Sequence, residues 1–177
     1  METLLNPSKV IEHIPIWDGI EVADFGCGSG IFTIEMAKAL KNNGRILAVD
    51  IQEKPLMFLM ENAKRQNVAN ILNTKVCNLE TKTLGSGFQN TFDVVVIVNT
   101  LFQVKNKENV IKEAKRILKA NGFLIVVDWD LYKIPMNENL FPVKKDELIE
   151  MIQKIGFNLK EGLKLSSTHF GLIFIKQ

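Results

Sequence analysis

The sequence predicts an α/β fold, a doubly wound and mostly parallel sheet of seven strands that ends in an antiparallel hairpin. Short apolar, β-rich runs alternate with helical segments along the whole chain, as in sheets with helices on both faces. The run from Val94 to Val98 is continuously apolar, which is typical of a strand buried on both faces of a parallel sheet. No helical pattern separates the last two predicted strands, so we expect them to pair antiparallel.

The first half of the chain begins with a short helix and then alternates strands with helices. Asn6 is placed to cap that helix and Pro7 to occupy its first turn, with an end near Ile14. The periodicity then predicts strands over 21–25, 45–49 and 71–77, and helices over 31–40 and 55–66.

The second half continues the alternation and closes with the hairpin. Asn106 is placed to cap a helix over 107–120, which Gly122 would end. Gly156 would end a further helix in the same way. The remaining elements are predicted as strands over 92–98 and 123–127, a helix over 144–155, and hairpin strands over 157–164 and 169–175.

Length and composition predict one soluble domain. The chain has 177 residues, of which 46% are hydrophobic and 24% charged, proportions that suit a globular core and argue against disorder. We expect a single domain over 1–177, in which 1–19 form a short N-terminal helix or lid segment. The formal net charge of +2 leaves nucleic-acid binding open without indicating it.

The sequence shows no sign of a membrane-spanning, disulfide-stabilised or metal-binding protein. The longest apolar runs are about five residues, whereas a membrane helix needs about 20. The two cysteines, Cys27 and Cys77, form no CxxC pair, so we expect neither a disulfide framework nor a metal site. These features predict a cytoplasmic protein with reduced cysteines.

A glycine-rich turn joins the first predicted strand to the next helix. Glycines stand at 26, 28 and 30, where the chain must turn sharply and let a ligand approach the backbone. The dinucleotide fingerprint G-x-G-x-x-G would require glycine at 31, where the chain has Ile31. Asp24 ends the strand, and its carboxylate suits a ligand with a cationic end better than a pyrophosphate.

Asp50 ends the second predicted strand, about 20 residues beyond Gly30. A carboxylate at this point can accept hydrogen bonds from both hydroxyls of a ribose. An aspartate that only caps a turn is the alternative, but the nearby glycine turn favours a ligand-binding role.

Four segments together resemble class I S-adenosylmethionine-dependent methyltransferases, over nearly the whole chain from about Asn6. Within this family the chain resembles the small-molecule group similar to ubiquinone and menaquinone biosynthesis enzymes. The resemblance implies a Rossmann-like fold, S-adenosyl-L-methionine as cofactor and S-adenosyl-L-homocysteine as product. The segments that carry it are 24–30, 48–50, 92–96 and 114–122.

The family's cofactor roles can be carried over by position. The glycine turn would line the methionine and ribose side, with Asp24 near the amino end and Asp50 on the ribose hydroxyls. Ile51 would pack on the adenine, whose edge Asn78 and Leu79 would meet. The methionine part would face the residues after the fourth strand. The full expected set is Asp24, Phe25, Gly26, Cys27, Gly28, Gly30, Asp50, Ile51, Asn78, Leu79, Asn99, Thr100 and Leu101.

No residue is a clear general base. Phe102 stands where many small-molecule members have a histidine, and methyl transfer needs a base only when the acceptor holds its proton firmly. The weak candidates are Asp128, Asp130 and Tyr132, after the fifth strand, and His169 at the start of the last strand. Each of these can equally be a structural residue.

Three functions therefore remain open. A methyltransferase that acts on a small molecule is favoured by the cofactor motifs. An RNA or protein methyltransferase is the first alternative, motivated by the lysines between Lys105 and Arg116, which also suit a solvated helix face. The second alternative is a non-catalytic module that binds S-adenosylmethionine. An NAD-binding domain is disfavoured by Ile31 and the terminal hairpin.

Overall fold

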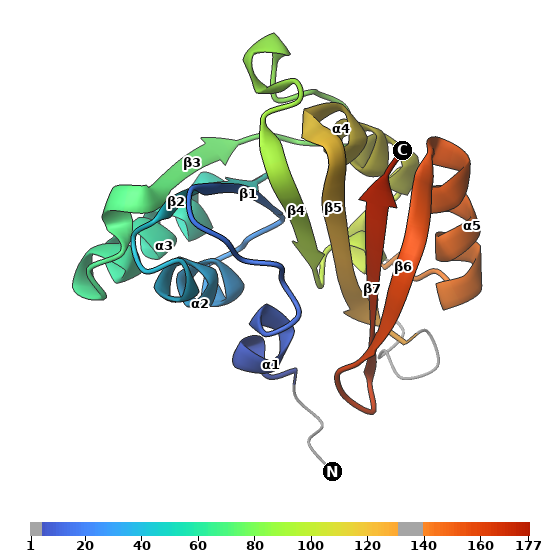
Figure 1. The fold of residues 1–177 in the computed structure, drawn as a ribbon, viewed down its shortest axis with the longest axis horizontal. Helices are drawn as coiled ribbons and strands as arrows, with labels where there is room; N and C mark the ends of the chain where they lie inside the picture. Colours follow the sequence, from blue (N-terminus) through green and yellow to red (C-terminus); the bar gives the residue numbers. More distant parts are fainter. Residues whose placement is uncertain (1–4, 131–139) are drawn as a thin grey trace.

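The computed structural model describes residues 5–130 and 140–177, and within them it shows one mixed sheet. The strand order across the sheet is β3-β2-β1-β4-β5-β7-β6 (Figure 1). The first five strands in sequence pair in parallel, and β7 pairs antiparallel with both of its neighbours. The strands are β1 Ile20–Phe25, β2 Gly44–Asp50, β3 Leu72–Val76, β4 Phe92–Val98, β5 Leu118–Trp129, β6 Phe157–Lys164 and β7 His169–Lys176.

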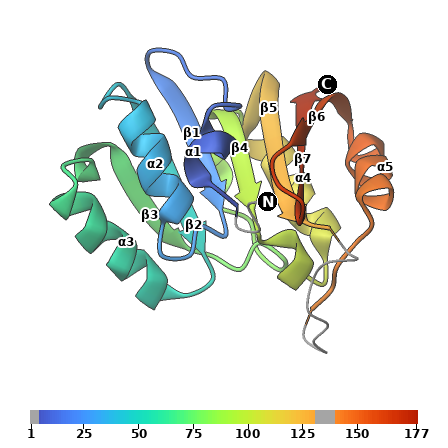
Figure 2. The ribbon, with the colours of Figure 1, turned by 90° about the horizontal axis from the view of Figure 1, so that it is seen from below.

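Helices cover both faces of this sheet (Figure 2). One apolar core packs α1, α2 and α3 against one face, and a second core packs α4 and α5 against the other. The helices are α1 Pro7–Ile11, α2 Ile31–Ala39, α3 Glu53–Arg65, α4 Lys107–Ile117 and α5 Lys145–Ile155. The predicted α/β class, the seven strands and the antiparallel hairpin are thus confirmed.

The strand order places a crevice at the carboxyl end of β1. This strand lies between β2 and β4, so the chain leaves it first toward one edge of the sheet and later toward the other. Loops that diverge in this way open a crevice at the switch point, where ligands of doubly wound sheets bind.

Two helices end earlier than the sequence pattern indicates. Leu118 is already extended (φ −69°, ψ 140°) and pairs with Phe92 of β4, so strand pairing overrides the helical propensity of the residues predicted up to 120. After the end of α1 at Ile11, the N–H groups of His13 and Ile14 bond to carbonyls three residues back. The following Pro15 disfavours further helix at Ile14.

No helix in 5–130 or 140–177 is long and apolar enough to cross a membrane.

Candidate cofactor site

A cavity of about 550 Å³ lies at the carboxyl ends of β1, β2, β3 and β4. It is the crevice that the strand order opens. The glycine turn lines one side of it and the turns after the other strands line the rest. Its lining residues are Asp24, Phe25, Gly26, Cys27, Gly28, Ser29, Ile31, Phe32, Val49, Asp50, Ile51, Gln52, Pro55, Cys77, Asn78, Leu79, Glu80, Val98, Asn99, Thr100, Gln103, Val104 and Val110.

The glycine turn has a backbone that only glycine adopts easily. Gly26 has φ +74° and Gly28 has φ +53°, both in the left-handed region. A Cβ at Gly26 would stand 2.3 Å from the Thr100 hydroxyl, so β1 and the turn after β4 approach too closely for a side chain. A Cβ at Gly28 would meet no protein atom within 4 Å, which leaves the space beside that backbone free for a ligand.

Asp50 is held in place by two backbone amides. Its Oδ2 accepts the N–H of Gly28 at 2.9 Å, and its Oδ1 accepts the N–H of Gln52 at 2.9 Å. A carboxylate has about four acceptor positions, so each oxygen keeps one for a ligand. Two oriented acceptors side by side match the two hydroxyls of a ribose.

Asp24 brings a buried carboxylate to the floor of the cavity. Its side chain is 2% exposed and accepts a hydrogen bond of 2.6 Å from the Thr33 hydroxyl. Burial, with a smaller contribution from the nearby Asp50 charge, raises the pKa of Asp24 to about 6. A carboxylate that has lost its hydration favours a cationic partner, such as the ammonium or sulfonium of the expected cofactor.

Asn99 offers an acceptor with no partner of its own. It is held at φ +51° after β4, where its N–H bonds to the Val127 carbonyl at 2.9 Å. Its Oδ1 is buried and finds no hydrogen-bond partner among the described residues. A buried orphan acceptor costs about 1–3 kcal/mol, and a ligand N–H or ammonium in the cavity would satisfy it. The acceptor groups of Asp24, Asp50 and Asn99 therefore fit the cationic end, the ribose hydroxyls and the amino group of S-adenosylmethionine.

The turn after β3 forms the other end of the cavity. Asn78 and Leu79 line it, as does Ile51, whose side chain is 57% exposed and would lose that exposure under a flat ring. The Asn78 Oδ1 accepts the N–H of Glu80 at 3.0 Å and keeps one acceptor position.

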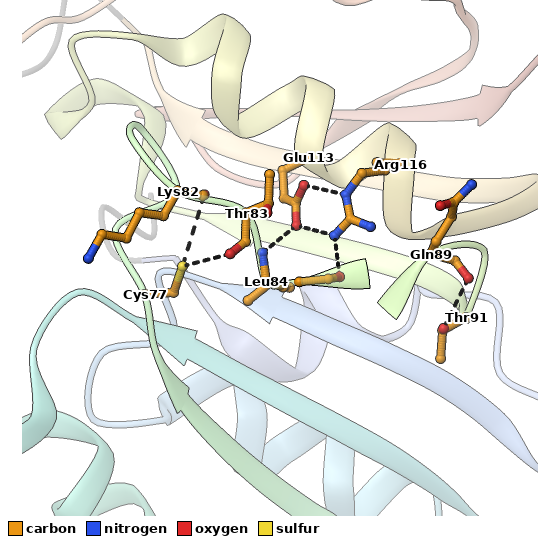
Figure 3. A network of polar contacts seen from close by, with 9 residues as sticks. Cys77, Lys82, Thr83, Leu84, Gln89, Thr91, Glu113 and Arg116 are labelled. Atoms are coloured by element: carbon orange, nitrogen blue, oxygen red, sulfur yellow. Dashed lines mark hydrogen bonds and ion pairs between the residues drawn. The ribbon is translucent and has the colours of Figure 1, made fainter. Parts of the chain in front are cut away.

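A buried polar network fixes the segment that follows this turn (Figure 3). The Glu113 carboxylate accepts the Leu84 N–H at 2.7 Å and two Arg116 N–H groups at 2.7 and 2.8 Å. Arg116 also donates to the Gly85 carbonyl at 2.9 Å. These bonds tie the segment after β3 to α4 and so hold one wall of the cavity in place.

Two residues of the expected cofactor set stand apart from the others. Gly30 and Leu101 are missing from the described residues that line the cavity. Gly30 caps the start of α2 at φ +86°, and a Cβ there would clash with Leu59 of α3. Leu101 is fully buried in the core beneath α4. Both shape the fold around the site, and their contact with the cofactor stays a prediction.

The expected set leaves out several lining residues, and many of these stand directly beside one of its members. Cys77 and Gln52 are examples, whereas Gln103 lies two residues beyond Leu101. The signal that finds them is adjacency to the strand ends, since every turn at this edge of the sheet presents more than one side chain. The rest are Ser29, Ile31, Phe32, Val49, Pro55, Glu80, Val98, Val104 and Val110.

The weak catalytic candidates lie in different surroundings. Asp128 is 2% exposed and accepts the N–H groups of Phe102 and Trp129 at 3.1 and 2.8 Å. These bonds tie the turn after β4 to the end of β5. Asp128 is absent from the described cavity lining. Asp130 follows β5, and its N–H bonds to the Thr168 carbonyl. Tyr132 lies outside the described residues. His169 is buried at the start of β7.

The sheet order, the glycine turn after β1 and the paired acceptors after β2 define a protein that binds an adenosyl cofactor. The model of the methyltransferase domain family matches residues 16–170. The chain belongs to this family, among the class I S-adenosylmethionine-dependent methyltransferases, and the cofactor class expected from the sequence is confirmed.

Relatives differ in what their names say they methylate. The ribosomal protein L11 methyltransferase of Dictyoglomus thermophilum is 31% identical over 140 residues, which cover 79% of this chain and 42% of that protein. The demethylmenaquinone methyltransferase of Staphylococcus saprophyticus is 25% identical over 172 residues, covering 89% of this chain and 71% of that protein. The chain thus spans less than half the length of the first relative.

Solved structures carry the same fold. A S-adenosylmethionine-dependent methyltransferase from Aquifex aeolicus superposes with a TM-score of 0.84, at 20% identity, over 98% of this chain and 91% of that chain. An identity this low supports the fold and leaves the acceptor open.

Proposed function

We propose that this chain transfers the methyl group of S-adenosylmethionine to a small molecule. The observation that carries the proposal is the set of oriented acceptors in one cavity, Asp50 and Asn99 with the buried Asp24 carboxylate. The likeness to a demethylmenaquinone methyltransferase over 71% of that protein supports a small acceptor. A cytoplasmic location stays a prediction, supported by the two free cysteines.

In this proposal the residues of the chain mainly bind and orient. The cofactor's sulfonium supplies an activated methyl group. Asp50 would accept the ribose hydroxyls, Asp24 would face the cationic end and Asn99 would accept an amino N–H. Correct orientation of two reactants contributes about 7–11 kcal/mol toward lowering a barrier, so an acceptor that loses its proton easily needs no general base.

A protein acceptor is the second candidate. The match to a ribosomal protein L11 methyltransferase at 31% identity favours it. That match covers 42% of the relative, whereas the match to a demethylmenaquinone methyltransferase covers 71% of that protein. We therefore rank a protein acceptor below a small molecule.

Methyl transfer can be tested without knowing the acceptor. Purified protein and S-adenosylmethionine with a radiolabelled methyl group are added to a host lysate. The mixture is then separated by ultrafiltration into a small-molecule and a macromolecular fraction. The proposal predicts label in the small-molecule fraction, and none above background with Asp50→Ala. Label only in the macromolecular fraction would support the protein acceptor. Binding of the cofactor with no label in either fraction would indicate a non-catalytic module.

A further inference from the structure

Three rings meet at the carboxyl edge of the sheet, next to the cofactor cavity. The Trp129 and His169 rings have centroids 4.1 Å apart, and the Phe102 ring meets Trp129 edge-on at 6.5 Å. Trp129 ends β5 and pairs directly with His169, the first residue of β7. Phe102 stands between Thr100 and Gln103, which both line the cavity. The cluster therefore extends from the methionine end of the cavity toward β7.

Asp128 holds the backbone of Phe102 and Trp129 in place. Its carboxylate accepts the N–H of Phe102 and the N–H of Trp129, so it joins the turn after β4 to the end of β5. The Trp129 side chain is half-buried, with part of its surface left uncovered. A ring fixed in this way offers a flat apolar surface at little entropic cost.

His169 holds a polar atom that the described residues leave unsatisfied. The residue is 6% exposed, and its Nε2 is buried without a hydrogen-bond partner in the described part of the chain. Burial lowers the pKa of the imidazole, so the ring is neutral at physiological pH. A buried ring nitrogen without a partner is rare and calls for a functional explanation.

The other ring nitrogen of His169 lies beside two hydroxyls. The Ser166 Oγ accepts the N–H groups of Thr168 and His169 at 3.2 and 3.1 Å, so its own O–H remains to be donated. The Ser166 and Thr168 hydroxyls are 3.2 Å apart and lie 3.3 and 2.9 Å from the His169 Nδ1. When Nδ1 accepts from one of these hydroxyls, the neutral imidazole carries its proton on Nε2.

We propose that Trp129 and His169 form the acceptor subsite, which takes a planar ring bearing a carbonyl or hydroxyl oxygen. The ring would pack on Trp129, and its oxygen would accept the Nε2–H of His169. In this role His169 is a binding residue and a hydrogen-bond donor, and it does not act as a general base. The inference rests on the proposed function and names the class of its small acceptor.

Nuclear magnetic resonance tests the subsite without the true substrate. The probes are 1-indanone, a planar aromatic ketone, and indane, the same ring system without the oxygen. Each is titrated into ¹⁵N-labelled protein, with and without S-adenosylhomocysteine, while the Trp129 indole N–H signal is followed. A Trp17→Phe variant assigns that signal, since the chain has two tryptophans.

The expected result has three parts. Indanone shifts the Trp129 signal saturably and binds about tenfold more tightly than indane, as one hydrogen bond to a buried N–H allows. His169→Phe keeps a ring against Trp129 but abolishes that preference. His13→Phe, at the exposed second histidine, preserves it. In the wild-type protein, the imidazole ¹⁵N signals of His169 show a proton on Nε2.

Each contrary result has a separate meaning. A Trp129 signal that neither probe moves, equal affinity for both probes, or a proton on Nδ1 overturns the subsite, whether or not His169→Phe folds. If S-adenosylhomocysteine still binds in those experiments, the proposed function stands even though the subsite is overturned. If S-adenosylhomocysteine fails to bind while indanone is still preferred through His169, the subsite stands and the proposed cofactor site falls.

Discussion

The Asp50 carboxylate accepts the backbone N–H of Gly28 at 2.9 Å, and this bond joins the end of β2 to the glycine turn after β1. The two strands are neighbours in the sheet, so their ends meet at the crevice. One residue thus has two roles, since it fixes the shape of the turn and presents the remaining acceptor positions to a ligand.

Replacing Gly26 by alanine should damage both the fold and the site. The new Cβ would meet the Thr100 side chain at 2.3 to 2.9 Å, and φ +74° strains any L residue. We expect a loss of roughly 1–3 kcal/mol in the free energy of unfolding, measured by urea denaturation, together with weaker binding of S-adenosylhomocysteine. Gly87→Ala is the control, because a Cβ there meets nothing within 4 Å. Equal stability of the two variants would contradict the close approach.

Affinity for S-adenosylhomocysteine should fall on acidification because of Asp24. The ligand keeps a cationic amino end, which favours the ionised carboxylate, and the pKa of Asp24 is raised to about 6. Between pH 7 and pH 5 the ionised fraction drops about tenfold, and we expect calorimetry to show a comparable drop in affinity. Asp24→Asn should bind weakly at both values. Adenosine, which lacks the amino end, should show no such dependence, and a parallel loss for adenosine would refute the role of Asp24.

The same carboxylate should cost stability in the protein without ligand. The pKa of Asp24 is higher in the folded chain than the ordinary aspartate value of 3.8, so folding favours the protonated form. The stability that protonated Asp24 contributes to the folded state is fully present below about pH 4 and is lost as pH rises through about 6. Asp24→Asn should therefore raise the free energy of unfolding at pH 7 by up to about 3 kcal/mol, with the gain fading toward pH 4. A variant less stable at every pH would contradict this assignment.

The Glu113 network should be worth far more than an exposed pair on the same helix. Glu113→Ala leaves the Leu84 N–H and the Arg116 guanidinium without their acceptor. We expect a loss of about 2–4 kcal/mol in the free energy of unfolding. Glu108→Ala breaks a pair with Lys112 whose side chains are both 58% exposed, so it should cost at most about 0.5 kcal/mol. Similar losses for both variants would show that the network does not anchor the segment after β3.

The sequence predicts the fold well because the residue types within a strand or a turn indicate its structure. The unbroken apolar run of β4 indicates burial on both faces, and the glycines at 26 and 28 mark positions with positive φ. The missed end of α4 depends on a distant partner. Leu118 leaves α4 because it pairs with Phe92, and no local pattern around 118 reveals that pairing.

The candidate site is predicted less completely for the same reason. Asp24, Asp50 and Asn99 follow from their places at strand ends, and all three line the cavity. Gly30 and Leu101 stand in the same turns, but a Cβ at Gly30 would meet Leu59, and Leu101 packs into the core beneath α4. Which side of a turn faces a ligand depends on tertiary packing, which spacing along the chain does not encode.

Calorimetric titration of the purified protein tests the central claim most directly. The ligands are S-adenosylmethionine, S-adenosylhomocysteine and NAD, and the proteins are wild type, Asp50→Ala and Asp18→Asn, whose aspartate is exposed and is not among the described residues that line the cavity. We expect wild type and Asp18→Asn to bind both adenosyl ligands but not NAD, and Asp50→Ala to lose at least about tenfold in affinity. Binding of NAD in preference, or unchanged affinity in Asp50→Ala, would contradict the assignment of this cavity to S-adenosylmethionine.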